Sequence, residues 1–237
     1  MRELSSIKAA VFDLDGTLLD SSGIWEDLGG RFLRSLGVTP ETELPEILSS
    51  MSLEEGCSYL SGHYRLRQTP EQVRTALLDI LSDFYRSECE LKSGAFQLLT
   101  KLKECGIPAV IATAGDRELS AAAMKRLDIL DMFCGMVTCR ECGGKDKPDI
   151  FLTAAKLAGS TPEHTAVFED SLMAVSTAKA AGFLTAAVSD ISEPQQDELK
   201  RTAHYYCSSL SDYLRFFSVQ ASEQSASARI SPSNSPV

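Results

Sequence analysis

The chain has 237 residues, 43% of them apolar, and a formal net charge of −10. This length allows one large domain or a core with a smaller second domain. The acidic balance argues against nucleic acid and anionic membranes as partners, because both need basic surface patches. No apolar run approaches the length needed to cross a bilayer. A small phosphorylated substrate stays open, since a metal ion and one lysine can set the local field.

Seven cysteines, an odd number, are scattered between Cys57 and Cys207. The N-terminus shows no signal-peptide pattern, so we expect reduced thiols in a cytoplasmic protein. Cys139 and Cys142 form a CxxC pair, but there is no second pair and no nearby histidine. We therefore expect incidental thiols at this pair rather than a zinc or redox site.

The first predicted element is a short apolar strand over residues 8–12, which delivers Asp13 and Asp15 into a turn at Gly16 and Thr17. Buried parallel strands are near-continuous apolar runs, and ligands bind beyond their carboxyl ends. Two carboxylates this close repel each other unless one is protonated or a cation joins them. Their oxygens suit magnesium, and an aspartate can itself attack phosphorus.

Residues from about 24 to 90 show helical periodicity and no clear strand. One apolar stripe at helical spacing ends at Gly37 and comprises Trp25, Leu28, Phe32, Leu33 and Leu36. Thr69 and Pro70 predict the N-cap and first position of another helix. Its apolar stripe comprises Val73, Leu77, Leu78, Leu81, Phe84 and Tyr85. We interpret this block as an inserted helical cap.

Strands and helices then alternate to the end of the core. Expected strands cover 109–112, 136–138, 165–168, 183–188 and 204–206. Expected helices cover 93–105, 117–127, 149–158, 171–181, 193–200 and 210–217. This alternation predicts an α/β fold with a doubly wound, Rossmann-like parallel sheet and an inserted all-helical cap.

The expected division of the chain follows from these elements. The core comprises residues 1–20 and 92–217, and the cap comprises residues 21–91. From residue 218 to 237, serine, alanine, glutamine and proline dominate. Such a segment cannot bury enough apolar surface to offset its ordering entropy, so we expect disorder there.

Three further strand ends carry polar residues. Thr113, before Ala114 and Gly115, offers a hydroxyl and free amides that suit phosphate, and a capped turn is an equally good interpretation. Lys145 precedes a helix and could neutralise phosphoryl oxygens, although most surface lysines are only solvated. Glu169-Asp170 could complete a magnesium site, while an acidic helix start is the commoner reason for such a pair.

The joint order Asp-x-Asp, Thr, Lys, Glu-Asp, each after an apolar run, resembles the four-motif signature of the haloacid dehalogenase-like superfamily over residues 7–217. The resemblance implies that Asp13 is the nucleophile and Asp15 the general acid and base. It implies that Thr113, the Ala114 amide and Gly16 hold phosphate and that Lys145 pairs with Asp13. The implied Mg²⁺ ligands are Asp13, the Asp15 backbone carbonyl, Glu169 and Asp170.

The lysine of the third motif needs a choice of register. The family's motif often is Lys-Pro-x-Pro-Asp, with lysine four residues before aspartate. Asp149 therefore selects Lys145, although Asp146 stands where the first proline is usual and Lys147 follows closely. We favour Lys145 on helix-start spacing.

The helical insert resembles the cap of the subgroup that contains phosphoglycolate phosphatases and beta-phosphoglucomutases. We expect a Mg²⁺-dependent phosphatase of a small phosphorylated metabolite, such as a sugar phosphate, which acts through an aspartyl-phosphate. The mutases tend to carry valine after the motif glycine, serine in the second motif and a histidine soon after the first. This chain has Thr17, Thr113 and Trp25 there, which favours the phosphatase.

Two other functions stay open. One is a beta-phosphoglucomutase-like sugar phosphomutase. The other, less favoured, is a non-hydrolytic phospho-acceptor signalling module. We expect a monomer or small homo-oligomer, with hinges at 21–23 and 92–94. Trp25 is expected to pack in the core of the cap rather than contact substrate, and His63 to be a solvated loop residue.

Overall fold

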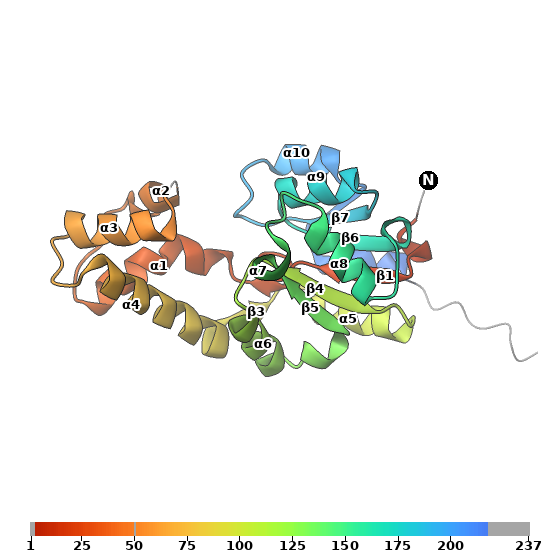
Figure 1. The fold of residues 1–237 in the computed structure, drawn as a ribbon, viewed down its shortest axis with the longest axis horizontal. Helices are drawn as coiled ribbons and strands as arrows, with labels where there is room; N and C mark the ends of the chain where they lie inside the picture. Colours follow the sequence, from red (N-terminus) through yellow and green to blue (C-terminus); the bar gives the residue numbers. More distant parts are fainter. Residues whose placement is uncertain (1–2, 50, 218–237) are drawn as a thin grey trace, which may run out of the picture.

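The computed structural model describes residues 3–49 and 51–217. A bundle of helices lies at one end of the molecule and an α/β core at the other (Figure 1). The predicted fold class, a parallel-sheet core with an inserted all-helical cap, is confirmed. The expectation for residues 218–237 falls outside the described residues. Within the described residues, no helix is both long and apolar enough to span a membrane.

The core is built on a parallel sheet, in which the described strands have the order β5-β4-β1-β6-β7-β8. These strands are β1 (Ala9–Phe12), β4 (Ala109–Thr113), β5 (Gly135–Thr138), β6 (Thr165–Glu169), β7 (Leu184–Val188) and β8 (Tyr205–Cys207). Strand β1 pairs with β4 on one side and with β6 on the other. The residues that follow β1 therefore lie between the ends of β4 and β6.

Helices cover both faces of the sheet (Figure 1). Successive side chains of β1 point to opposite faces, as in any strand. Phe12 packs in the cluster that contains helix α5 (Ala95–Glu104) and helix α6 (Arg117–Arg126). Val11 packs in the cluster of helix α8 (Asp149–Leu157) and helix α9 (Leu172–Ala180). Because β1 is buried from both sides, its sequence is apolar at every position.

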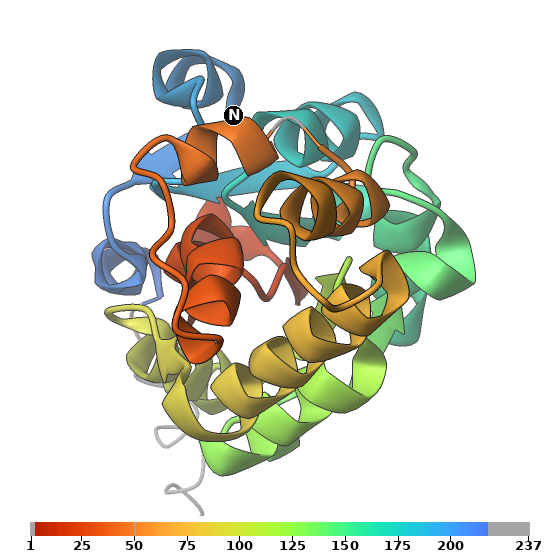
Figure 2. The same ribbon diagram turned by 90° about the vertical axis from the view of Figure 1, so that its left-hand side faces the viewer.

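The cap contains four α-helices among the described residues and faces the viewer in Figure 2. They are α1 (Ser22–Ser35), α2 (Leu44–Ser49), α3 (Leu53–His63) and α4 (Pro70–Asp83). Ser52 and Thr69 close capping boxes at the starts of α3 and α4. A short π-helix, Phe84–Glu88, continues α4. A two-stranded antiparallel ribbon of β2 (Leu19–Asp20) and β3 (Glu90–Leu91), which the sequence pattern did not predict, joins both ends of the cap to the core.

Some elements differ from the expected ones. Helix α10 covers Gln196–Thr202 rather than 193–200, because the proline at 194 disfavours helical backbone at Glu193. The last segment, Leu210–Phe216, is a 3-10 helix. Its three residues per turn put Leu210 and Tyr213 on one buried face. The CxxC pair lies in a short helix, α7 (Cys139–Cys142), and all seven cysteines are free.

Candidate active site

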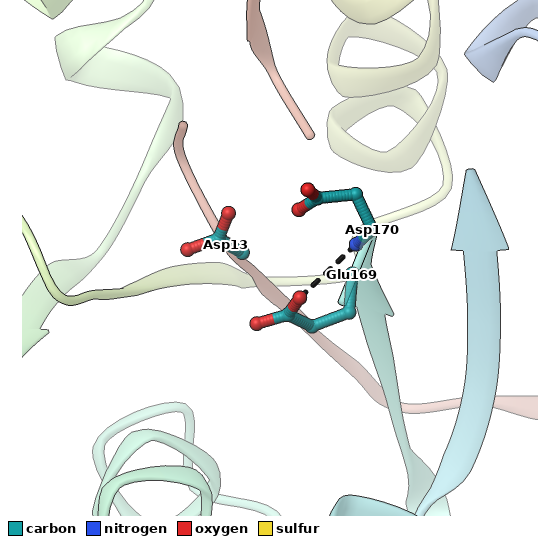
Figure 3. Close-up of side chains that lie close together, drawn as sticks. All are labelled: Asp13, Glu169 and Asp170. Atoms are coloured by element: carbon teal, nitrogen blue, oxygen red, sulfur yellow. Dashed lines mark hydrogen bonds between the residues drawn. The ribbon is translucent and has the colours of Figure 1, made fainter. Parts of the chain in front are cut away.

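Three carboxylates meet at the carboxyl edge of the sheet (Figure 3). Asp13 follows β1, and its amide donates to Phe168 O of β6 at 3.0 Å. Glu169 ends β6, and Asp170 follows it. All three side chains are buried, and one oxygen of each lies within 4.8 Å of the others. The pairing of β1 with β6 therefore brings the first and last sequence motifs together.

Lys145 lies against two of these carboxylates. Its Nζ donates to Asp13 Oδ1 and, at 2.6 Å, to Glu169 Oε1. Burial alone would lower the pKa of Lys145, but the charges of Asp13 and Glu169 raise it above its usual value. The ammonium group therefore stays charged. Lys147 is exposed, and no ion pair joins its side chain to the described residues.

Glu169 and Asp170 are held differently. Glu169 Oε2 accepts the backbone amides of Asp170 and Ser171, each at 3.0 Å, so both Glu169 oxygens have protein partners. Asp170 Oδ1 accepts the Thr17 hydroxyl at 2.8 Å. Burial, then the charges of Glu169 and Asp13, raise the pKa of Asp170 to about 9. The cluster therefore resists full ionisation by itself.

The donor set fits a divalent cation of the magnesium type. Three buried carboxylates face a single lysine, so a further positive charge would relieve their repulsion. Oxygen donors are those that Mg²⁺ prefers. Gly16 adds a close approach: its φ is +80°, and a Cβ there would lie 2.5 Å from Asp170 Oδ2. Only glycine leaves the Asp170 carboxylate in this place.

Asp15 points away from this cluster. Its Oδ1 accepts the hydroxyls of Ser21, at 2.8 Å, and Tyr85, at 2.6 Å. Burial, then the charge of Asp13, raise the pKa of Asp15. Tyr85 belongs to the π-helix at the end of the cap, so a cap residue contacts the expected acid and base. The sequence placed Tyr85 only in an apolar stripe, and π-helices of one turn are often found at functional sites.

The second motif lies beside Asp15. Thr113 is fully buried, and its Oγ1 accepts the Gly115 amide at 2.9 Å. Ala114 between them is exposed. A Cβ on Gly115 would lie 3.1 Å from Asp15 Oδ2. The turn after β4 and the Asp15 carboxylate thus border the same space, and all four motifs meet at one edge of the sheet.

A second, partly buried network, which the sequence did not reveal, joins the turn at Gly16 to both ends of the cap. Lys92 Nζ donates to Gly16 O at 2.7 Å, Ser189 O at 2.8 Å and Asp190 Oδ2 at 2.6 Å. Asp190 Oδ1 accepts the Ser22 hydroxyl. Although burial opposes it, hydrogen bonds from Lys92 and Ser22 lower the pKa of Asp190. The two expected hinges are therefore tied to the loop after β7.

One cap residue, Trp25, differs from expectation, and another, His63, lies apart from the site. Trp25 is 53% exposed and lines a cavity beside Asp15, so the expectation of core packing was wrong. Ser22 and Ile24 of the same first turn of α1 are buried, so Trp25 lies on the side of this turn that faces the cavity. His63 ends α3, where its Nε2 lies 2.9 Å from Glu41 Oε1 and its ring stacks on Tyr59.

Comparisons with known proteins agree with this geometry. The family model of haloacid dehalogenase-like hydrolases matches residues 7–182. Hexitol phosphatase A of Escherichia coli is 28% identical over 83% of this chain and 90% of its own length. Beta-phosphoglucomutase of Bacillus subtilis is 26% identical over 77% of this chain and 83% of its own. The structure of CbbY from Rhodobacter sphaeroides in complex with phosphate superposes with a TM-score of 0.69 at 20% identity, covering 89% and 99% of the two chains.

Proposed function

Because the chain belongs to the haloacid dehalogenase-like hydrolases, we propose that it is a Mg²⁺-dependent phosphatase of a small phosphate monoester and that it acts through an aspartyl-phosphate. The observation that carries this proposal is the arrangement around Asp13. One buried carboxylate lies against a charged lysine and two further carboxylates, while a second aspartate, Asp15, lies at the mouth of the same site.

Each residue has a role in the proposed reaction. An Asp13 carboxylate oxygen attacks phosphorus, and the bond from phosphorus to the ester oxygen breaks. Asp15 gives its proton to that oxygen, so the alcohol leaves neutral. Asp15 then takes a proton from water as the water oxygen attacks the phosphorus, which releases inorganic phosphate and restores Asp13.

The remaining groups hold charge. Lys145 holds the Asp13 carboxylate through its hydrogen bond, and its ammonium group offsets negative charge on the phosphoryl oxygens. The Thr113 hydroxyl and the Ala114 amide would hold those oxygens. Asp13, Asp170 and Glu169 would hold Mg²⁺ together with the Asp15 carbonyl. When bound, the ion shields an anionic nucleophile from an anionic ester.

The cap and core are proposed to divide as the sequence indicates, with the cap at 21–91 and the core at 1–20 and 92–217. The cap supplies Ser21 and Trp25 to the space beside Asp15. Residues of the cap would then select the alcohol that leaves. A reducing, cytoplasmic location is proposed on the seven free cysteines.

A sugar phosphomutase on the same site is the second candidate, favoured by the likeness to beta-phosphoglucomutase. It would need a bisphosphate that stays bound and turns round. Conversion of a sugar 1-phosphate to the 6-phosphate without net phosphate release would support the mutase and exclude the phosphatase.

The first experiment measures phosphate release from a panel of monoesters with Mg²⁺ or EDTA. We expect turnover that EDTA abolishes and that Asp13→Asn and Asp15→Asn both remove. Asp20→Asn is the matched control, because Asp20 is an exposed carboxylate on the same segment. Mass spectrometry of protein quenched in acid during turnover should show phosphate on Asp13. Release that is equal in EDTA or in Asp13→Asn would refute the proposal.

A further inference from the structure

A cavity of about 390 Å³ lies between cap and core and opens on Asp15. Its volume lies in the range of small-molecule sites. Residues of α1 and α2 form its cap side, and the loop after β7 forms its core side. Since Asp15 is the proposed proton donor to the leaving oxygen, this cavity is where the leaving alcohol would lie.

The cavity has large apolar side chains on both sides. Trp25 of α1 is 53% exposed, and Ile191 of the β7–α10 loop is 73% exposed. Pro45 and Leu48 of α2 extend the apolar wall. An apolar ligand that covers these large side chains removes apolar surface from water, which favours binding. The face of an indole also favours stacking with another ring.

The polar groups of the cavity are mostly engaged within the protein. Ser21 donates to Asp15, while Ser22 and Ser192 donate to Asp190. Because these three hydroxyls donate to carboxylates of the protein, a leaving group with many acceptor oxygens finds few free donors. Glu26 is exposed at the wall and has no ion pair or hydrogen bond to the described residues.

The charge of the cavity restricts the substrate further. Its described lining residues include Asp15 and Glu26 but no lysine or arginine. A carboxylate or a second phosphate on the leaving group would meet only negative side chains, which costs binding. A donor N–H or O–H on the leaving group would instead find an acceptor in Glu26.

A second, smaller cavity of about 190 Å³ shares Trp25 and Leu48 with the first. Its other described lining residues, among them Leu28, Leu53, Leu60 and Leu77, are almost all apolar or glycine. The apolar character therefore continues into the cap, away from Asp15.

We propose that the substrate is a monophosphate ester whose leaving alcohol carries an uncharged aromatic ring, bound between Trp25 and Ile191. This inference rests on the proposed phosphatase and names its substrate class. It sets aside a simple sugar phosphate, a carboxylated ester and a bisphosphate. It also disfavours the mutase, which needs a second phosphate in this cavity.

The binding test does not depend on turnover. Trp25 is the single tryptophan of the chain, so its fluorescence reports directly on the cavity. Benzylphosphonate and ethylphosphonate, which cannot be hydrolysed, are titrated with Mg²⁺ present. We expect benzylphosphonate to quench the fluorescence and to bind about tenfold more tightly than ethylphosphonate, the effect of one ring-stacking contact. Equal affinities, or no quenching, would overturn the inference.

The kinetic test compares benzyl phosphate, glycerol 2-phosphate and phosphoglycolate. Trp25→Ala should raise KM for benzyl phosphate about tenfold and leave glycerol 2-phosphate nearly unchanged. Phe96→Ala, which removes an exposed aromatic ring from α5 instead, should change neither. Glu26→Gln should improve phosphoglycolate alone, because it removes a repelling charge.

The outcomes separate the inference from the proposed function. Release of phosphate from glycerol 2-phosphate or phosphoglycolate in preference to benzyl phosphate would sink the substrate class but keep the phosphatase. Absence of release from every ester, with selective binding of benzylphosphonate, would keep the aromatic site but remove the phosphatase. Equal effects of Trp25→Ala on all esters would show a structural role for Trp25 and overturn the inference.

Discussion

Replacing Gly16 by alanine tests whether the turn after Asp15 must stay clear for Asp170. Gly16 has a φ of +80°, and an added Cβ would lie 2.5 Å from Asp170 Oδ2 and 2.9 Å from its Cγ. The carboxylate must move by about 0.9 Å to regain ordinary van der Waals contact at 3.4 Å. That movement strains its hydrogen bond from Thr17 and shifts a proposed Mg²⁺ ligand.

Two effects contribute to the expected magnitude. A left-handed backbone costs a residue with a Cβ about 1–2 kcal/mol. Crowding of a well-packed site adds about 1–3 kcal/mol. Changing a residue that positions a metal ligand typically weakens metal affinity by about 10–100-fold. We therefore expect Gly16→Ala to be destabilised and to need much more Mg²⁺ for half-maximal activity.

Gly37→Ala is the matched control. Gly37 has a similar φ of +73°, but nothing lies within 4 Å of an added Cβ. Gly37→Ala should lose only the folding stability that a left-handed backbone costs a residue with a Cβ, about 1–2 kcal/mol. It should keep the Mg²⁺ dependence of the native protein. Thermal denaturation and Mg²⁺ titration of phosphate release measure both effects. A Gly16→Ala protein whose Mg²⁺ titration matches that of Gly37→Ala would refute the steric argument.

Three further predictions follow from the buried charges. Lys145→Gln should lower kcat about 100-fold or more. Lys147→Gln should keep kcat within about twofold of the native value, because surface charges contribute little. The reverse result would show that Lys147, and not Lys145, is the lysine of the third motif. The pKa of Asp170 is raised in the folded protein, so without metal this group costs stability as pH rises from about 4 to about 9. Since Mg²⁺ binds the carboxylate, the rise in Tm that it causes should be larger at pH 8.5 than at pH 6, and an equal rise at both would contradict this assignment. Lys92→Met should cost about 3 kcal/mol of folding stability, because it leaves the Asp190 carboxylate buried and without its cation. In urea denaturation, the double variant Lys92→Met/Asp190→Asn should lose less stability than the sum of the two single variants. Strict additivity would argue against coupling between the two residues.

The strand ends were predictable because parallel sheets carry their own sequence signature. Strand β1 is buried on both faces, so it is a continuous apolar run, and Asp13 marks its end. The same pattern located Thr113 at the end of β4 and Glu169 at the end of β6. Parallel pairing then requires these ends to meet at one edge. Lys145 followed from spacing, and the structure places it against Asp13.

The contacts around Asp15 and the cap linkers could not be predicted in this way. Tyr85 reaches Asp15 across 70 positions, and Lys92 reaches Asp190 across 98. Neither pair has a local pattern. The first contact depends on the packing of the cap on the core, and the second on the packing of Lys92 against the loop after β7. Trp25 was misjudged because helical spacing identifies an apolar stripe but not which of its residues border a cavity. The close packing at Gly94, which the sequence suggested only as part of a hinge, could not be predicted either: a Cβ there would lie 2.1 Å from Ser211 N.

The ribbon of β2 and β3 has a consequence for how the cap could arise and be exchanged. Leu19 pairs with Leu91 and Asp20 with Glu90, so the chain leaves the core and returns to it at neighbouring points. A segment whose ends already touch adds little loop-closure entropy to the core, however long it is. The core can therefore accept inserted segments of different length and sequence at the β2–β3 ribbon without changing its own strand order. A different domain inserted between Asp20 and Glu90 would therefore lie directly beside the existing hydrolytic centre.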